Sequence, residues 1–218
     1  MKHPVGIMGG TFDPIHFGHL VAAEEARLRF RLARVIFIPN GRPPHKKEYR
    51  VSPAQTRCDM LVLATASNAE FEVSRIEVDR PGPSYAVDTV EEIKRRVGYE
   101  TPLYFITGAD AIVELTTWHE PARLAEMCEF IAVMRPGYDL QRLEQALRPD
   151  FMARTRLLQI PGVDISSTEI RRRAGSGESL RYLTPEAVVR YIESRSLYRK
   201  TSVRSSVATP GDPPSADR

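Results

Sequence analysis

The sequence predicts an α/β fold in which a doubly wound parallel sheet is joined to a small C-terminal helical part. Short, β-branched apolar runs alternate with longer segments rich in Ala, Leu, Glu and Arg, the strong helix formers. With 218 residues, 42% hydrophobic and 27% charged, the chain has the size and composition of a globular domain. We expect one domain over residues 1–200. We expect a disordered tail over 201–218, where the sequence becomes polar and rich in Pro and Ser.

The predicted strands are six apolar runs, and the third of them alternates openly enough to suggest an edge strand. In chain order they cover residues 5–8, 35–39, 71–78, 103–107, 130–134 and 157–160. The predicted helices lie between and after them. They cover residues 17–31, the segment from Ser52-Pro53 to about Ala66, residues 85–97 with Ser84 as cap, a helix opened by Ser166-Ser167-Thr168-Glu169, and one from Thr184-Pro185-Glu186 to about Leu197.

Charge and cysteine content exclude several classes of protein. Lys and Arg number 31 against 28 Asp and Glu, a net charge of +3. This slight basic excess does not indicate a nucleic-acid-binding protein, which would show a concentrated basic stripe. The two cysteines, Cys58 and Cys128, form no CxxC pair, so neither a disulfide framework nor a cysteine zinc site is expected. The sequence shows no signal peptide and no run of the roughly 20 apolar residues that a membrane span needs. We expect a cytoplasmic protein without membrane partners. The sequence does not decide whether the protein forms a homo-oligomer.

The segment GGTFDPIHFGH, residues 9–19, lies between the first predicted strand and the first predicted helix. Gly9 and Gly10 would let the backbone approach a phosphate, and the helix start would offer it free N–H groups. His16 and His19 are three residues apart, so a helical turn would place both imidazoles on one face. The alternative to phosphate binding is a structural role, in which one histidine caps the helix and the other is buried and hydrogen-bonded.

Two further segments could bind phosphates. Pro43-Pro44-His45-Lys46-Lys47 reads by itself as a solvated basic loop, but beside a phosphate site it would be a plausible clamp. The N–H groups of Ser167 and Thr168, with Arg171 one turn on, would form a second anion site. The alternative for this second segment is an ordinary capping box with a solvated arginine.

Three other segments could bind an organic substrate. The N–H groups of Tyr85 and Ala86 could hold a carboxylate, although the sequence alone favours a well-capped helix there. Asp110, after a predicted strand, could accept hydrogen bonds from ribose hydroxyls or act as a helix N-cap. Trp118, the only tryptophan, is either a core residue or a stacking platform.

As a set, these motifs resemble the nucleotidyltransferase superfamily whose hallmark is His-x-Gly-His or Thr-x-Gly-His, here His16-Phe17-Gly18-His19. From about Val5 to Tyr198 the chain is similar to bacterial nicotinate-nucleotide adenylyltransferases. The resemblance implies a Rossmann-like nucleotidyltransferase fold and transfer of the adenylyl group of ATP to nicotinate mononucleotide. The products would be deamido-NAD and pyrophosphate, in NAD biosynthesis. It also implies Mg²⁺ bound through the ATP phosphates, with no metal ligand from the protein.

The same resemblance implies roles for individual residues. The catalytic set is His16, His19, Lys46 and Arg171. The ATP-binding set is Gly9, Gly10, Thr11, Phe12, His16, His19, Gly108, Asp110, Arg135, Ser166, Ser167, Thr168 and Arg171. The set for nicotinate mononucleotide is His45, Lys46, Ser84, Tyr85, Ala86, Asp110 and Trp118.

Two other functions compete with this one. The first is adenylyl transfer to a different acceptor, nicotinamide mononucleotide or phosphopantetheine. The second belongs to another class, a nucleotide-binding oxidoreductase or sensor. Against the second, the glycine turn reads Gly9-Gly10-Thr11 instead of GxGxxG, and the histidine pair would have no role.

Overall fold

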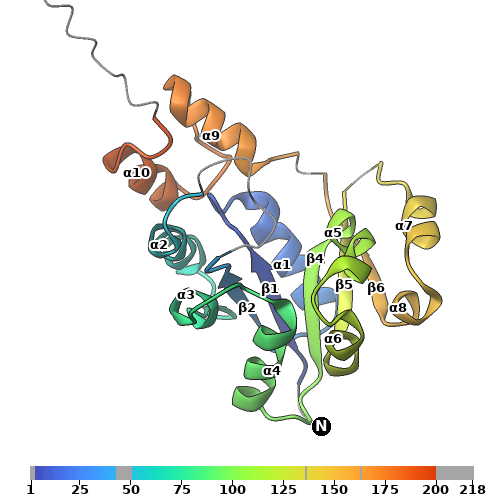
Figure 1. The fold of residues 1–218 in the computed structure, drawn as a ribbon. Helices are drawn as coiled ribbons and strands as arrows, with labels where there is room; N and C mark the ends of the chain where they lie inside the picture. Colours follow the sequence, from blue (N-terminus) through green and yellow to red (C-terminus); the bar gives the residue numbers. More distant parts are fainter. Residues whose placement is uncertain (1–2, 43–50, 136, 163, 200–218) are drawn as a thin grey trace, which may run out of the picture.

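The computed structural model describes residues 3–42, 51–135, 137–162 and 164–199. Its six strands form a single sheet in the order β3-β2-β1-β4-β5-β6, and every neighbouring pair is parallel (Figure 1). The strands are β1 (Val5–Gly10), β2 (Arg34–Pro39), β3 (Phe71–Val73), β4 (Leu103–Gly108), β5 (Glu129–Met134) and β6 (Thr155–Gln159). The predicted parallel α/β fold is confirmed.

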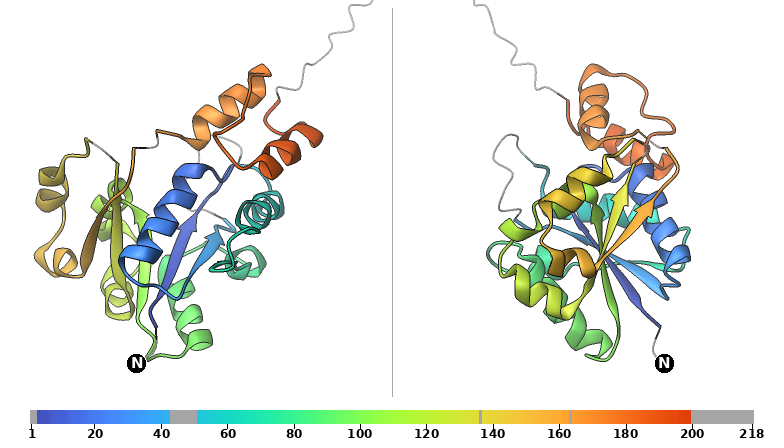
Figure 2. Two further views of the ribbon diagram at one scale, coloured as in Figure 1. Left: turned by 180° about the vertical axis from the view of Figure 1, so that it is seen from behind. Right: turned by 90° about the vertical axis from the view of Figure 1, so that its right-hand side faces the viewer.

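Helices cover both faces of this sheet (Figures 1 and 2). One face packs against α1 (Phe17–Arg29), α2 (Ala54–Thr65), α9 (Ser167–Ser176) and α10 (Glu186–Ser194). The other packs against α4 (Ala86–Val97), α5 (Ala109–Val113), η1 (Leu115–Thr117), α6 (Pro121–Met127), α7 (Leu140–Ala146) and α8 (Pro149–Ala153). None of the described helices is long and apolar enough to cross a membrane.

The apolar runs of the sequence fit a sheet that is buried on both sides. Successive residues of a strand point to opposite faces, so Ile7 and Ile36 join one core while Met8 and Phe37 join the other. All four side chains are buried. The two cores hold β1 rigidly, and with it the segment that leaves its carboxyl end.

The edge strand is shorter than predicted. A strand over residues 71–78 is wrong beyond Val73, although β3 does lie at the edge of the sheet. The chain instead forms the short helix α3 (Ile76–Asp79). There the buried Glu77 carboxylate accepts hydrogen bonds from Asn40 Nδ2 (3.0 Å) and Thr89 Oγ1 (2.6 Å). The sequence alternation did not anticipate these buried polar contacts, which connect α3 with β2 and α4.

The first strand is longer than predicted. Gly9 and Gly10 belong to β1 and pair with Ile38 and Pro39 of β2. The two glycines therefore end the strand, and the turn toward α1 begins only at Thr11.

Two of the predicted helix caps lie elsewhere. Pro53, and not Ser52, is the N-cap residue of α2. The main-chain N–H of Ser52 donates a hydrogen bond to Asp13 Oδ2 (3.0 Å). The cap predicted at Ser166 is confirmed, since its Oγ accepts from the N–H of Glu169 (3.2 Å). The predicted tail, 201–218, lies outside the described residues.

Ser84 is not the cap of α4 either. The N-cap residue is Tyr85, and Ser84 Oγ instead accepts hydrogen bonds from the N–H groups of Gly41 (3.0 Å) and Arg42 (3.2 Å). The prediction for Ser84 is wrong because its hydroxyl joins the loop after β2 to the loop before α4. This contact brings the start of α4 to the carboxyl edge of the sheet.

Candidate active site

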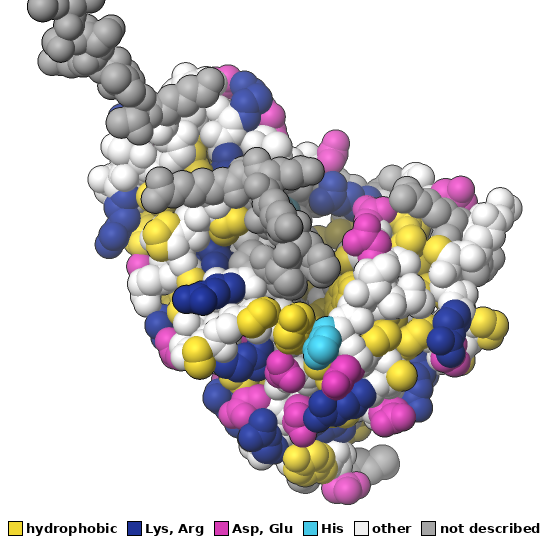
Figure 3. All heavy atoms as spheres, in the orientation of Figure 1, with side chains coloured by type: hydrophobic (Ala, Val, Ile, Leu, Met, Phe, Trp, Pro, Cys, Tyr) yellow, Lys and Arg dark blue, Asp and Glu magenta, His cyan; other side chains and the backbone are white. Residues whose placement is uncertain are grey.

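The strand order reverses between β1 and β4, which places a crevice at their carboxyl ends. A pocket of about 220 Å³ lies there, formed by the ends of β1, β4 and β5 and the start of α1. Figure 3 shows a hollow with hydrophobic side chains in its wall, on a face where charges of both signs are interspersed. The pocket is lined by Met8, Gly9, His16, Gly18, His19, Ala22, Ile106, Thr107, Gly108, Val133, Arg135 and Ile160. Five of the predicted ATP-binding residues are therefore brought together: Gly9, His16, His19, Gly108 and Arg135.

The two histidines face each other at the start of α1. His16 is the N-cap residue and His19 lies in the first turn, and their rings are stacked with centroids 3.8 Å apart. The main-chain N–H of His16 points to Nδ1 of His19 at 3.4 Å, a long contact. When His19 is neutral, this contact favours a proton on Nε2. Gly18 leaves room for the His16 ring, since a Cβ at position 18 would lie 3.0 Å from His16 Nδ1 and would require the imidazole to shift slightly.

His16 is neutral at physiological pH. Burial lowers its pKa to about 4, with a smaller contribution from the charge of Arg135. Its side chain is 4% exposed, and Nδ1 has no hydrogen-bond partner among the described residues. A neutral imidazole has one N–H to donate, so His16 would stabilise a phosphate by hydrogen bonding and not by charge.

The start of α9 meets the loop between β1 and α1. Ser167 Oγ donates a hydrogen bond to the carbonyl of Pro14 (2.9 Å). Arg171 donates to the carbonyl of Asp13 (2.7 Å) and to Thr168 Oγ1 (3.1 Å). The N-termini of α1 and α9 therefore lie on either side of one loop. Since helix N-termini carry partial positive charge, both favour an anion beside this loop.

A buried arginine fixes the loops around the site. Arg57 of α2 is 1% exposed. Its guanidinium donates to the carbonyls of Thr11 (2.8 Å) and Ser52 (3.0 Å), and also to those of Asn40 and Gly41. It thus joins the segment after β1 to both chain stretches that flank residues 43–50. The predicted site residues His45 and Lys46 belong to residues 43–50, which lie outside the described residues.

The predicted acceptor-binding residues form a second group beside the pocket. Trp118 is half-buried and packs edge-on against Phe105, with ring centroids 5.6 Å apart. A Cβ on Gly9 would lie 3.1 Å from the same Phe105 ring, so this one ring connects Trp118 to the pocket. Tyr85 stacks on His119 with centroids 4.2 Å apart. The start of α4 and the segment around Trp118 are thereby joined.

Not every predicted site residue lines the pocket. Asp110 is exposed at the second position of α5, whose N-cap is Gly108, so its predicted role as N-cap is wrong. Phe12 is 2% exposed and its ring packs edge-on against His19, so only its backbone could touch a ligand. Arg57 and Asp13 were not among the predicted site residues. Asp13 lies inside the segment of residues 9–19, whereas Arg57 lies in no motif of the sequence.

The chain is similar to known proteins. Residues 7–173 match the family model described as Cytidylyltransferase-like. A relative from Moorella thermoacetica, named "Probable nicotinate-nucleotide adenylyltransferase", is 57% identical over 199 residues, covering 89% of this chain and 91% of the relative. A relative of the same name from Acidothermus cellulolyticus is 47% identical, covering 90% of this chain and 95% of the relative. This chain belongs to the nicotinate-nucleotide adenylyltransferase family.

A solved structure supports the fold. The Plasmodium falciparum nicotinic acid mononucleotide adenylyltransferase complexed with NaAD is similar with a TM-score of 0.73 at 18% identity, over 90% of this chain and 98% of that chain. The Rossmann-like sheet expected from the resemblance to the adenylyltransferase family is thus the one observed.

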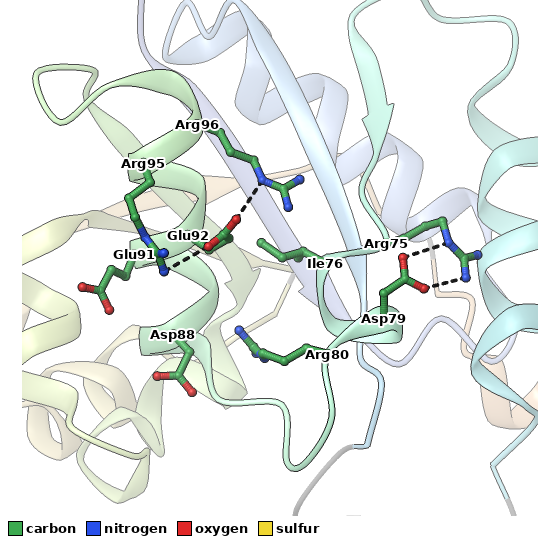
Figure 4. Close-up of a pocket in the computed structure, with 9 residues that line it drawn as sticks. All are labelled: Arg75, Ile76, Asp79, Arg80, Asp88, Glu91, Glu92, Arg95 and Arg96. Carbon is green, nitrogen blue, oxygen red and sulfur yellow. Dashed lines mark hydrogen bonds and ion pairs between the residues drawn. The ribbon is translucent and has the colours of Figure 1, made fainter.

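A larger hollow of about 540 Å³ lies between α3 and α4 (Figure 4). Around Ile76 it is lined by four arginines and four acidic residues: Arg75, Arg80, Arg95, Arg96, Asp79, Asp88, Glu91 and Glu92. Arg75 pairs with Asp79, and Arg95 and Arg96 both pair with Glu92. Because the charges balance, the hollow offers no excess charge to the polyanionic substrates of an adenylyltransferase.

The lowered pKa of His16 predicts a pH dependence of stability. Between pH 6.5 and about 4 the unfolded chain protonates this histidine while the folded chain does not, so the free energy of unfolding falls as the pH falls through this range. This pKa difference corresponds to on the order of 3 kcal/mol. Urea unfolding of wild type and His16→Gln at several pH values measures it. The variant should lose less stability than wild type over this range; parallel pH curves would contradict the assignment.

The contacts of Arg57 predict a large stability loss in Arg57→Lys. An ammonium group cannot reach the same carbonyls together, and each buried acceptor left without a donor costs about 1–3 kcal/mol. We expect the free energy of unfolding to fall by at least about 3 kcal/mol. Arg95→Lys, at an exposed position of α4, is the control and should change it by less than about 0.5 kcal/mol. Equal effects of the two changes would refute this role of Arg57.

Proposed function

We propose that this chain transfers the adenylyl group of ATP to nicotinate mononucleotide, forming deamido-NAD and pyrophosphate. The observation that carries the proposal is the convergence of two helix N-termini on one loop beside the pocket. The start of α1 adds the stacked His16 and His19, and the start of α9 adds Arg171. This arrangement suits a polyphosphate, and the family relationship supports ATP as its source.

The chemistry needs no covalent enzyme intermediate. An oxygen of the acceptor's 5′-phosphate attacks the α-phosphorus of ATP, the bond from that phosphorus to the oxygen bridging the α- and β-phosphates breaks, and pyrophosphate leaves. The protein's contribution is to hold the two phosphates in line and to stabilise charge on the transferring group. His16 and His19 would donate hydrogen bonds to that group, and Arg171 would bind the neighbouring phosphates.

Mg²⁺ would be bound through the phosphates of ATP. In the described part of the chain, no group of three or more His, Cys, Asp or Glu side chains could hold a metal ion. The groups beside the pocket are hydrogen-bond donors and cations, which fit phosphate oxygens and not a bare cation. When bound, the ion would neutralise charge on the departing pyrophosphate.

The acceptor would lie against the start of α4. Tyr85 is the N-cap residue and Ala86 the first residue of the helix, so the N–H groups of this turn have no partner within the helix. They can hold the nicotinate carboxylate, while Trp118 offers an aromatic face to the pyridine ring. His45 and Lys46 would contact the reacting phosphates, a role that rests on the resemblance and on the nearby anchoring of Gly41 and Ser52. The free, buried Cys58 and Cys128 suit a reducing, cytoplasmic location.

Pyrophosphate release tests the proposed function. The assay contains ATP and Mg²⁺ with nicotinate mononucleotide, nicotinamide mononucleotide or phosphopantetheine as the acceptor. We expect the highest kcat/KM with nicotinate mononucleotide. A higher value for either other acceptor would replace the proposed substrate, and no release with any of the three would reject adenylyl transfer.

His19→Ala should lower kcat by roughly 10²–10³-fold, the usual effect of removing one preorganised donor. His3→Ala is the matched control, because His3 is an exposed histidine just before β1, at the opposite edge of the sheet. It should leave kcat within about twofold of wild type. Steady-state kinetics and thermal melting of both variants make the comparison. An unchanged kcat in folded His19→Ala would exclude His19 from catalysis.

Ala86→Pro should reduce the preference for the acid over the amide of the mononucleotide. Wild type should favour the acid by tenfold to a hundredfold, since a buried donor left facing a carboxamide NH₂ costs about 1–3 kcal/mol. Proline is tolerated at the first position of a helix, and the extended backbone of Tyr85 suits a following proline, so the variant removes one N–H while keeping α4.

The measurement is kcat/KM for both mononucleotides in both proteins, with the KM for ATP and the Tm as internal controls. The controls should be unchanged. A preference that Ala86→Pro leaves intact would contradict a carboxylate site at this helix start.

A further inference from the structure

Asp13 connects three distant segments to the loop between β1 and α1. Its side chain is buried, and each carboxylate oxygen accepts one hydrogen bond: Oδ2 from the N–H of Ser52 (3.0 Å) and Oδ1 from the hydroxyl of Tyr198 (2.7 Å). Its main-chain carbonyl accepts from Arg171 Nη1 (2.7 Å). The loop that carries His16 therefore depends on Asp13 for its position relative to α9.

Tyr198 comes from the far end of the described chain, 185 residues after Asp13. Its backbone has φ = 65°, a left-handed conformation that residues other than glycine rarely adopt. Tyr198 lies four residues after the end of α10, and in this conformation its hydroxyl reaches Asp13. Burial raises the pKa of the Tyr198 phenol, which therefore remains a hydrogen-bond donor.

We propose that Tyr198 is a positioning residue for adenylyl transfer. Its hydroxyl fixes the carboxylate of Asp13, and the Asp13 carbonyl in turn accepts a hydrogen bond from the guanidinium of Arg171. Tyr198, near the end of the described residues, thus helps to align the phosphate-binding arginine with the histidines at the start of α1. This inference rests on the proposed function, but it assigns a role to a residue that does not line the pocket.

The chain contains a matched control. Tyr191 of α10 donates a hydrogen bond from its hydroxyl to Asp59 Oδ2 of α2, also at 2.7 Å. This bond has the same chemistry and the same length and likewise joins the C-terminal part to the rest of the fold. Its acceptor lies in the middle of α2 and not in the loop beside the pocket. A purely structural role would make the two tyrosines equivalent.

The experiment compares Tyr198→Phe with Tyr191→Phe. Each change removes one oxygen atom and keeps the ring. We expect a similar, small fall in Tm for both variants. Only Tyr198→Phe should lower kcat, by tenfold or more, with the KM for nicotinate mononucleotide within about threefold of wild type. A kcat of Tyr198→Phe within twofold of that of Tyr191→Phe would overturn the proposal.

A double-mutant cycle tests whether Tyr198 acts through Arg171. In an Arg171→Ala background, Tyr198→Phe should change kcat by less than twofold, because the group that it positions is gone. If the kcat loss of the double variant equals the product of the losses of the two single variants, the proposed connection is overturned. Should Tyr198→Phe not fold, Asp13→Asn replaces one of the two acceptor oxygens by an amide. It should lower kcat tenfold or more, and an unchanged kcat would overturn the proposal.

The wild-type assay separates this inference from the proposed function. If wild type releases no pyrophosphate with any acceptor, the proposed function fails. If wild type is active and the two tyrosine variants have equal kcat, only the role of Tyr198 fails.

Discussion

The geometry of the site depends on how the loop between β1 and α1 is held in place. Three donors fix its backbone: the buried Arg57 binds the carbonyl of Thr11, and the partly exposed Arg171 and Ser167 bind the carbonyls of the buried residues Asp13 and Pro14. Buried polar groups are costly to leave unpaired, so each of these bonds restricts the loop strongly. The result is a rigid backbone segment from which His16 and His19 extend.

The electrostatics of the site follow from this arrangement more than from the net charge of the chain. The N-termini of α1 and α9 supply fixed partial positive charge without the desolvation that a buried lysine would require. Burial, and to a smaller extent the charge of Arg135, keeps His16 neutral. Arg135 itself is exposed at the pocket rim. A polyphosphate would therefore meet donors of graded charge, from a neutral imidazole to a full guanidinium.

The sequence predicted much of the fold and of the site because the signals are local. Alternating apolar runs and helical segments indicated the parallel sheet, and the His16–His19 spacing indicated a shared position at a helix start. The cap at Ser166 was likewise predicted from four consecutive residues. By contrast, α5, α7 and α8 have five to seven residues each, too few for a helical periodicity to be recognised.

What the sequence by itself determined is the set of chemical groups and the order in which the chain presents them at the carboxyl edge of the sheet. Only the tertiary structure decided which groups would be joined. Ser52 and Ser84 carry good capping side chains, yet the N–H of the first and the hydroxyl of the second bond to residues about 40 positions away. Tyr198 reaches Asp13 across nearly the whole chain. Such contacts are decided when buried polar groups must find partners in the folded interior, and no local pattern records which partner each will find.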